Sequence, residues 1–167
     1  QNADGSLVHE SVASDLEVAN SICWSLDGKT MYLADSPKKQ IHAYDYEDGS
    51  ISKMRLLHTK PSNQRSIPDG SCVDSEGYIW NAVWRGGEAE SFVQRIDPES
   101  GQVVFTVHMP DNTSQVTCCC FGGANLDIMF ITTAAEGRDD EPHAGGLYAA
   151  KLPFRGLPEC RLKFKVP

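Results

Sequence analysis

The amino-acid sequence predicts an all-β protein, a β-propeller of four-stranded antiparallel blades of which about three are present. Helical periodicity is nearly absent, and short β-rich runs alternate with turns rich in Gly, Asp and Pro. The runs also recur as copies of one unit, so that Asn20 and Asp69 occupy equivalent positions 49 residues apart. A four-stranded unit that repeats at about 40–50 residues is typical of a propeller blade.

The expected strands form three sets along the chain. They are 22–25, 31–34, 41–46 and 52–58, then 71–74, 79–84, 92–96 and 103–108, then 117–121, 128–133 and 146–151. The segment "NSICWSLDGKTMYLAD" (20–35) aligns with "DGSCVDSEGYIWNAVW" (69–84), which places Gly28 and Gly77 in the same turn. Residues 135–144 are expected to form a short helix or an irregular loop.

These runs imply one partial propeller domain over residues 1–167. A leading strand at 3–12 belongs to an earlier blade, the blades span about 20–60, 69–110 and 116–152, and 153–167 form a tail. Propellers close with about 4–8 blades, so three blades leave two exposed sheet edges and an uncovered inner face. We therefore expect the chain to pair with a missing N-terminal half of the propeller or with another copy of itself.

The net charge and the cysteine spacing indicate which partners to exclude and which cellular compartment to expect. The formal net charge is −8, whereas nucleic acids and anionic membranes attract basic surfaces, so neither is expected as a partner. No run approaches the ~20 apolar residues that a membrane span needs. The six cysteines show no C-x-x-C or Cys/His ligand spacing. We interpret them as small buried hydrophobic residues in a reducing compartment, the cytoplasm.

Asn20 and Asp69 are the candidate metal ligands. Each is expected just before the innermost strand of its blade, where strand starts converge on the propeller axis, and oxygen ligands suit a hard cation such as Ca²⁺. Asp69 stands in Pro-Asp-Gly, however, which is also an ordinary turn sequence. The residues alone leave both interpretations open. In the looser third copy, Gln115 and Thr117 are the oxygen-bearing residues of this region.

The chain resembles the gluconolactonase/regucalcin (senescence marker protein) family from about residue 3 to residue 160. The resemblance is carried by "ANSICWSLDGKTMYLADSPKKQIHAYDYEDGSIS", "IPDGSCVDSEGYIWNAVWRGG" and "TCCCFGG…MFITTA…AGGLY". It implies a six-bladed propeller with one divalent ion on its axis, Ca²⁺ first and Zn²⁺, Mn²⁺ or Mg²⁺ as alternatives. It also implies hydrolysis of sugar lactones and related cyclic esters.

Carried over residue by residue, the resemblance makes Asn20 and Asp69 metal ligands and Asp69 also the proposed general base. Ser21 departs from the family, which usually has Gly after the ligand Asn. The family's N-terminal half supplies a Glu ligand, a further Asn and an Arg, none of which can be placed in this sequence. The resemblance therefore implies a C-terminal half-propeller that carries half of the metal site.

The expected reaction is attack of a metal-activated water on a lactone carbonyl. Trp84 and Arg85 follow a second strand at the same mouth, so Trp84 is a candidate to pack on a sugar-like ring and Arg85 to steady an oxyanion. A packed aromatic and a solvated loop charge are the competing interpretations of these two residues. Two other functions remain open: a non-catalytic calcium-binding or interaction propeller, and an inactive fragment.

Overall fold

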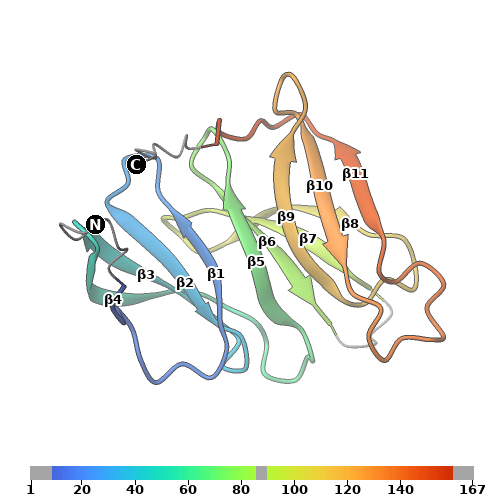
Figure 1. Ribbon diagram of the computed structural model, residues 1–167, viewed down its shortest axis with the longest axis horizontal. Helices are drawn as coiled ribbons and strands as arrows, with labels where there is room; N and C mark the ends of the chain where they lie inside the picture. Colours follow the sequence, from blue (N-terminus) through green and yellow to red (C-terminus); the bar gives the residue numbers. More distant parts are fainter. Residues whose placement is uncertain (1–8, 86–89, 160–167) are drawn as a thin grey trace, which may run out of the picture.

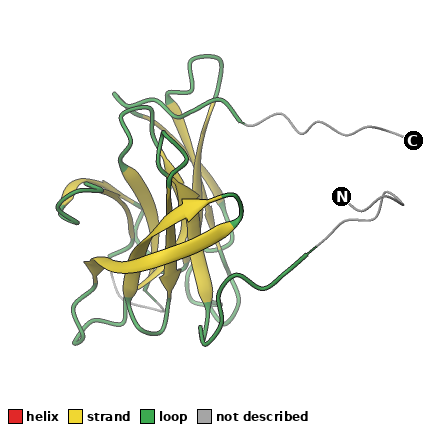
Figure 2. Cartoon of the chain, turned by 90° about the vertical axis from the view of Figure 1, so that its left-hand side faces the viewer, coloured by secondary structure: helices red, strands yellow, loops and turns green. Residues whose placement is uncertain are grey.

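Eleven strands make up the regular structure of the described residues, 9–85 and 90–159, in the computed structural model, and none of these residues is helical (Figure 2). The strands are β1 (Ala19–Trp24), β2 (Thr30–Asp35), β3 (Gln40–Glu47), β4 (Ser50–Thr59), β5 (Ile67–Val73), β6 (Ile79–Trp84), β7 (Phe92–Ile96), β8 (Val103–His108), β9 (Val116–Gly122), β10 (Ile128–Thr133) and β11 (Leu147–Lys151). Within this part of the chain, therefore, no helix is available that could cross a bilayer.

The strands form three antiparallel sheets in chain order, β1-β2-β3-β4, β5-β6-β7-β8 and β9-β10-β11. The first strands of the three sheets, β1, β5 and β9, run side by side, and the sheets fan out behind them (Figure 1). This is the arrangement of consecutive blades in a propeller, with β1, β5 and β9 as the innermost strands. The prediction of an all-β partial propeller is confirmed.

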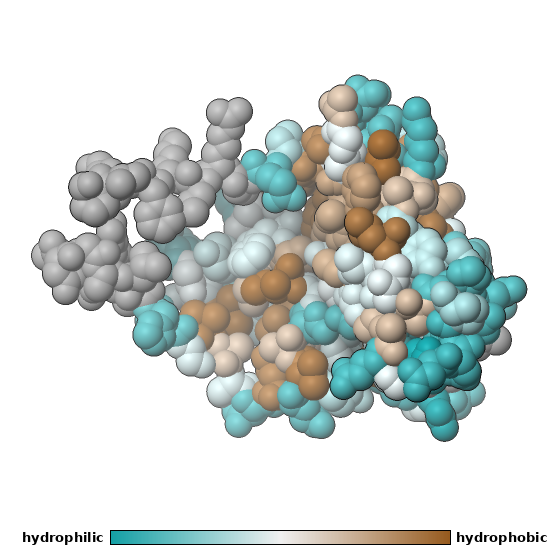
Figure 3. Space-filling model, turned by 45° about the vertical axis from the view of Figure 1, so that its right-hand side comes forward, coloured by the Kyte–Doolittle hydropathy of each residue, from teal (hydrophilic) through white to brown (hydrophobic). Residues whose placement is uncertain are grey.

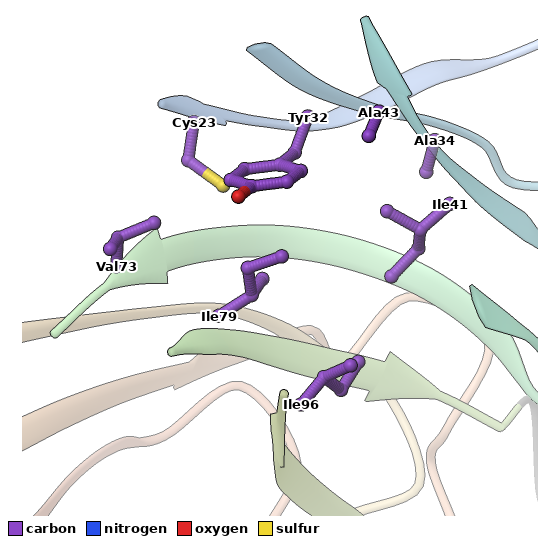
Figure 4. Packing of buried hydrophobic residues seen from close by; sticks show 8 residues of the cluster. All are labelled: Cys23, Tyr32, Ala34, Ile41, Ala43, Val73, Ile79 and Ile96. Atoms are coloured by element: carbon purple, nitrogen blue, oxygen red, sulfur yellow. The ribbon is translucent and has the colours of Figure 1, made fainter. Parts of the chain in front are cut away.

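Apolar side chains fill the space between neighbouring sheets. Between the first two sheets, Ile41 and Tyr32 pack against Ile79 and Ile96 (Figure 4). Between the second and third sheets, the fully buried Trp80 stands edge-on to the rings of Phe121 and Phe154, with centroids 5.6 and 5.4 Å away. Each large apolar side chain buried in this way contributes roughly 1.5–3 kcal/mol, so these contacts fix the angle between blades.

Two expectations about local structure need correction. The expected leading strand at 3–12 lies mostly outside the described residues, and the described part, 9–12, forms no strand. Of the two alternatives for 135–144, the irregular loop is the one found: the segment contains turns and no helix. Strands β1 and β5 also begin earlier than expected, at Ala19 and Ile67, so the two candidate ligands lie inside strands and not before them.

The interpretation of all cysteines as buried was only partly right. Cys23 and Cys119 are buried, whereas Cys118 and Cys120 are exposed and Cys72 is half-buried. The three consecutive cysteines lie on β9, where neighbouring side chains point to opposite faces, so only the middle one enters the core. All five are free thiols, and Cys160 lies outside the described residues.

Candidate functional site

Asn20 and Asp69 lie at β-bulges in the first halves of β1 and β5. In β1, Asn20 pairs with Ala34 and Cys23 with Tyr32, so one extra residue is inserted between the two pairs. In β5, the same insertion separates Pro68 from Ser71. A bulge bends its strand and re-aims the side chains beside it. The bulges therefore direct both candidate ligands to one point between the two innermost strands.

The two side chains meet directly. The Nδ2 of Asn20 donates a hydrogen bond of 2.7 Å to Oδ1 of Asp69, and the Oδ1 of Asn20 accepts one of 3.0 Å from the backbone N–H of Ser21. The prediction that equivalent positions of two blades face the same point is confirmed by this contact. Their role as metal ligands stays a prediction.

Burial raises the pKa of Asp69 above its usual value, because a half-buried carboxylate loses hydration. Hydrogen bonds from the Asn20 amide and the Gly70 N–H act in the opposite direction without cancelling the shift. Burial at this point depends on Gly70, since a Cβ there would stand 2.6 Å from Sγ of Cys118. Only glycine lets β5 approach β9 this closely.

The donor set fits part of a site for a hard cation. One carboxylate and one amide oxygen suit Ca²⁺, which takes 6–8 oxygen ligands, so further ligands are required. Within residues 9–85 and 90–159, no group of three or more His, Cys, Asp or Glu side chains is placed to hold a metal ion. Asn20 now presents its N–H to Asp69. Its Oδ1 has a second lone pair beside the one that accepts from Ser21, and this lone pair is the one available to a cation.

A concavity of about 390 Å³ adjoins the pair. It is lined by residues 19–22, Leu33, Gly70, Ser71 and Cys118, so all three innermost strands contribute to it. The side-chain hydrogen bonds of the two oxygen-bearing candidates of the third copy are made within that part of the chain and not to the pair. Gln115 donates instead to the carbonyl of Glu136, and Thr117 shares a hydrogen bond with Thr132.

The structure separates Arg85 from the Asn20–Asp69 pair. Its guanidinium lies over the ring of Phe92, 5.1 Å from the centroid, and lines a different concavity beside Lys60. Trp84 pairs through its backbone with Ile67, two residues before Asp69, but does not line the concavity next to Asn20. The proposed contact of Trp84 with substrate stays a prediction, and the oxyanion role of Arg85 gains no support from this geometry.

Sequence reasoning missed one residue of the site, Asn81. Asn81 is fully buried, and its Nδ2 lies 3.0 to 3.1 Å from three acceptors that share its two N–H donors: the hydroxyl of Ser21, the carbonyl of Asp69 and the hydroxyl of Ser71. The signal was present in the sequence, because Asn81 is the one polar residue of the apolar strand "IWNAVW". A polar side chain inside a buried strand indicates a specific hydrogen-bond partner.

The comparison with family models matches residues 2–135 of the chain to the SMP-30/Gluconolactonase/LRE-like region. Among proteins of related sequence, regucalcin of Xenopus laevis is 39% identical over 140 residues. That alignment covers 80% of this chain and 44% of the relative. The chain thus spans about half the length of the relatives that it matches.

Two solved structures have a fold similar to that of this chain. A luciferin-regenerating enzyme superposes with a TM-score of 0.77 and 34% identity, over 90% of this chain and 50% of the other. Regucalcin from Agrobacterium tumefaciens, described as a calcium-binding protein, superposes with a TM-score of 0.76 and 27% identity, over 90% and 52% of the two chains.

Proposed function

Because the chain belongs to the SMP-30/gluconolactonase/LRE-like family, we propose that it is part of a metal-dependent hydrolase that opens sugar lactones. The observation that carries this proposal is the contact between Asn20 and Asp69, which unites an amide and a carboxylate from two innermost strands. The family description names gluconolactonase, and the concavity beside the pair is large enough for several ring atoms of a sugar-sized molecule.

In this proposal Asn20 and Asp69 hold a divalent ion, most favourably Ca²⁺, with Zn²⁺, Mn²⁺ and Mg²⁺ as alternatives. The calcium-binding description of the Agrobacterium regucalcin supports Ca²⁺. When bound, such an ion polarises an ester carbonyl and lowers the pKa of water. Asp69 orients the neighbouring amide and is placed to accept a proton. Ligation lowers the basicity of a carboxylate, so we assign Asp69 the ligand role first and the role of general base second.

The remaining ligands would come from further blades of the same kind. Apolar side chains are exposed on both end sheets: Leu147 is 69% exposed on the third, and Ile22 is 57% exposed on the first. Figure 3 brings the third sheet forward and shows apolar surface among polar side chains. We propose that these two faces pack against three more blades, which close a six-bladed ring around the Asn20–Asp69 pair. Five free thiols fit a reducing compartment, and we place the protein in the cytoplasm.

The test is hydrolysis of a sugar lactone, followed by acid release with a pH indicator in the presence of Ca²⁺. It is run on this chain and on any longer chain that its coding sequence specifies. Removal of the ion with a chelator or the substitution Asp69→Asn should each lower the rate at least about 100-fold. Asp97→Asn, in an exposed turn, is the matched control and should leave the rate unchanged.

The competing function is a calcium-binding or interaction propeller without catalysis. It is favoured if calorimetry detects Ca²⁺ binding that Asp69→Asn abolishes while every lactone stays intact. Absence of both binding and hydrolysis from the longest chain would refute the metal-dependent function. Light scattering on this chain distinguishes the source of the other blades, because a dimer would indicate that a second copy supplies them.

A further inference from the structure

A buried amide links the two bulges that carry the proposed ligands. Asn81 lies in the middle of β6 with no exposed surface, and its backbone pairs with Ser71 on one side and Gln94 on the other. Its Nδ2 stands 3.0 Å from Oγ of Ser21 and 3.1 Å from the carbonyl oxygen of Asp69. These contacts satisfy the N–H side of the amide, whereas its Oδ1 is buried and finds no hydrogen-bond partner in the part of the chain that the structure describes. A buried polar group left without a partner costs about 1–3 kcal/mol, so the N–H contacts offset part of the cost of Asn at this position.

Ser21 is the second member of this link. Its φ of +57° lies in the left-handed region, which glycine adopts without strain and other residues adopt at a cost. Its hydroxyl donates a 2.5 Å hydrogen bond to the carbonyl of Asp69 and accepts the bond from Asn81. The side chain is 2% exposed, so these bonds compete with no water. The hydroxyl therefore offsets the backbone strain by joining the bulge of β1 to that of β5.

The bulge of β5 is fixed at both of its carbonyls. Ser36, at the end of β2, donates a 2.6 Å hydrogen bond to the carbonyl of Pro68, and Ser21 does the same to the next carbonyl, that of Asp69. Both hydroxyls come from the first blade. The position of Asp69 relative to Asn20 is thus held by the direct hydrogen bond between their side chains and also by these two hydrogen bonds to the backbone of β5.

We propose that Ser21 and Asn81 form a positioning clamp that fixes the spacing of Asn20 and Asp69 and thereby selects the size of the bound cation. This proposal depends on the proposed metal site and specifies what determines its choice of ion. Neither residue is a ligand, and both act through the backbone of the two bulges. Selectivity between cations depends on the size and rigidity of the ligand cage, so a fixed spacing favours one ionic radius. Loss of residues that orient ligands typically lowers metal affinity 10–100-fold.

The variants are Ser21→Gly, which removes the hydroxyl and also relieves the backbone strain, and Asn81→Val, which removes the amide from an apolar strand. Ser91→Ala is the matched control, because this buried hydroxyl bonds Thr113 and neither bulge. Affinities for Mg²⁺, Ca²⁺ and Sr²⁺ are measured by calorimetry on the longest available chain, alongside its unfolding midpoint. Either clamp variant should lower the affinity for the preferred ion about 10-fold or more and the others less, so that selectivity falls.

A purely structural role would lower all three affinities by the same factor, and that result, or unchanged affinities, would overturn the proposal. If the wild-type chain binds none of these ions, the proposed function is refuted. Whether Ser21 and Asn81 fix the spacing of Asn20 and Asp69 is then tested without metal. The side-chain amide protons of Asn20, bonded to Asp69, then serve as the probe in hydrogen-exchange NMR. Faster exchange in Ser21→Gly than in Ser91→Ala supports the clamp, and equal exchange refutes it.

Discussion

Removal of the Asp74 carboxylate should destabilise the second blade more than any other single change to a charged residue that we consider. Asp74 follows β5 and has no exposed surface. Its Oδ2 accepts hydrogen bonds from Nε of Arg95 at 2.7 Å and from the Trp80 indole at 2.9 Å. Its Oδ1 accepts from the backbone N–H groups of Glu76 and Tyr78. One carboxylate thus closes a turn and neutralises a buried guanidinium.

The substitution Asp74→Ala leaves that guanidinium without its buried partner. The Arg95 side chain is 7% exposed and lies 3.7 Å from the centroid of the Tyr78 ring, so it cannot move easily into water. Breaking one partner out of a buried ion pair costs about 3–5 kcal/mol. Glu76, 2.7 Å from the other end of the guanidinium, compensates in part. We therefore expect a loss of about 4 kcal/mol, a large share of the roughly 5–15 kcal/mol typical of a whole domain.

The assay is equilibrium unfolding in urea, followed by circular dichroism. Asp97→Ala is the control, because Asp97 accepts the same kind of turn bonds, from the Glu99 N–H and the Ser100 hydroxyl, but is partly exposed and has no arginine partner within the described residues. A double variant in which Arg95→Met accompanies Asp74→Ala should be more stable than Asp74→Ala alone. The argument is refuted if Asp74→Ala and Asp97→Ala lower the free energy of unfolding equally. It is also refuted if the losses in the double variant are additive, because the unpaired Arg95 guanidinium would then contribute nothing.

Two further predictions concern buried positions outside the proposed site. Burial, assisted by the nearby charge of Arg85, lowers the pKa of Lys60 to about 7, whereas an unfolded lysine titrates near 10.4. Between these values the unfolded state binds the additional proton. The free energy of unfolding of wild type minus that of Lys60→Met should therefore rise by about 1.2 kcal/mol between pH 7.5 and pH 8.5. Urea titrations across that range would contradict this if the difference stays flat. Gly101→Ala should unfold the chain at markedly lower urea than Gly28→Ala, since both glycines have φ near +70° but a Cβ at 101 would stand within 2 Å of the Leu57 carbonyl and one at 28 meets nothing.

The sequence predicted the fold well because the strands and turns of each blade can be recognised from short sequence patterns. The eleven strands expected between residues 22 and 151 are all present, although the leading strand expected at 3–12 is not found in its described part, and the equivalence of Asn20 with Asp69 predicted that the two side chains face the same point. Strand starts were missed at Ala19 and Ile67, because a bulge breaks the regular alternation from which a strand is recognised. The exposure of Cys118 and Cys120 was missed for another reason. Side chains alternate between the two faces of β9, so only Cys119 enters the core, whereas Cys118 lines the concavity beside the Asn20–Asp69 pair.

The Ser21–Asn81 link shows what a repeat cannot predict. Internal equivalence transfers a position from one blade to the next, and it indicated both members of the proposed ligand pair. Ser21 and Asn81, however, come from different blades and occupy different places in the repeat, β1 in one case and β6 in the other. Their hydrogen bond exists only because the two blades pack face to face. Pairings of this kind depend on the angle between sheets, which apolar contacts such as Ile41 with Ile79 establish and which no local pattern encodes. The spacing of a ligand pair can therefore differ between relatives whose ligand residues are the same.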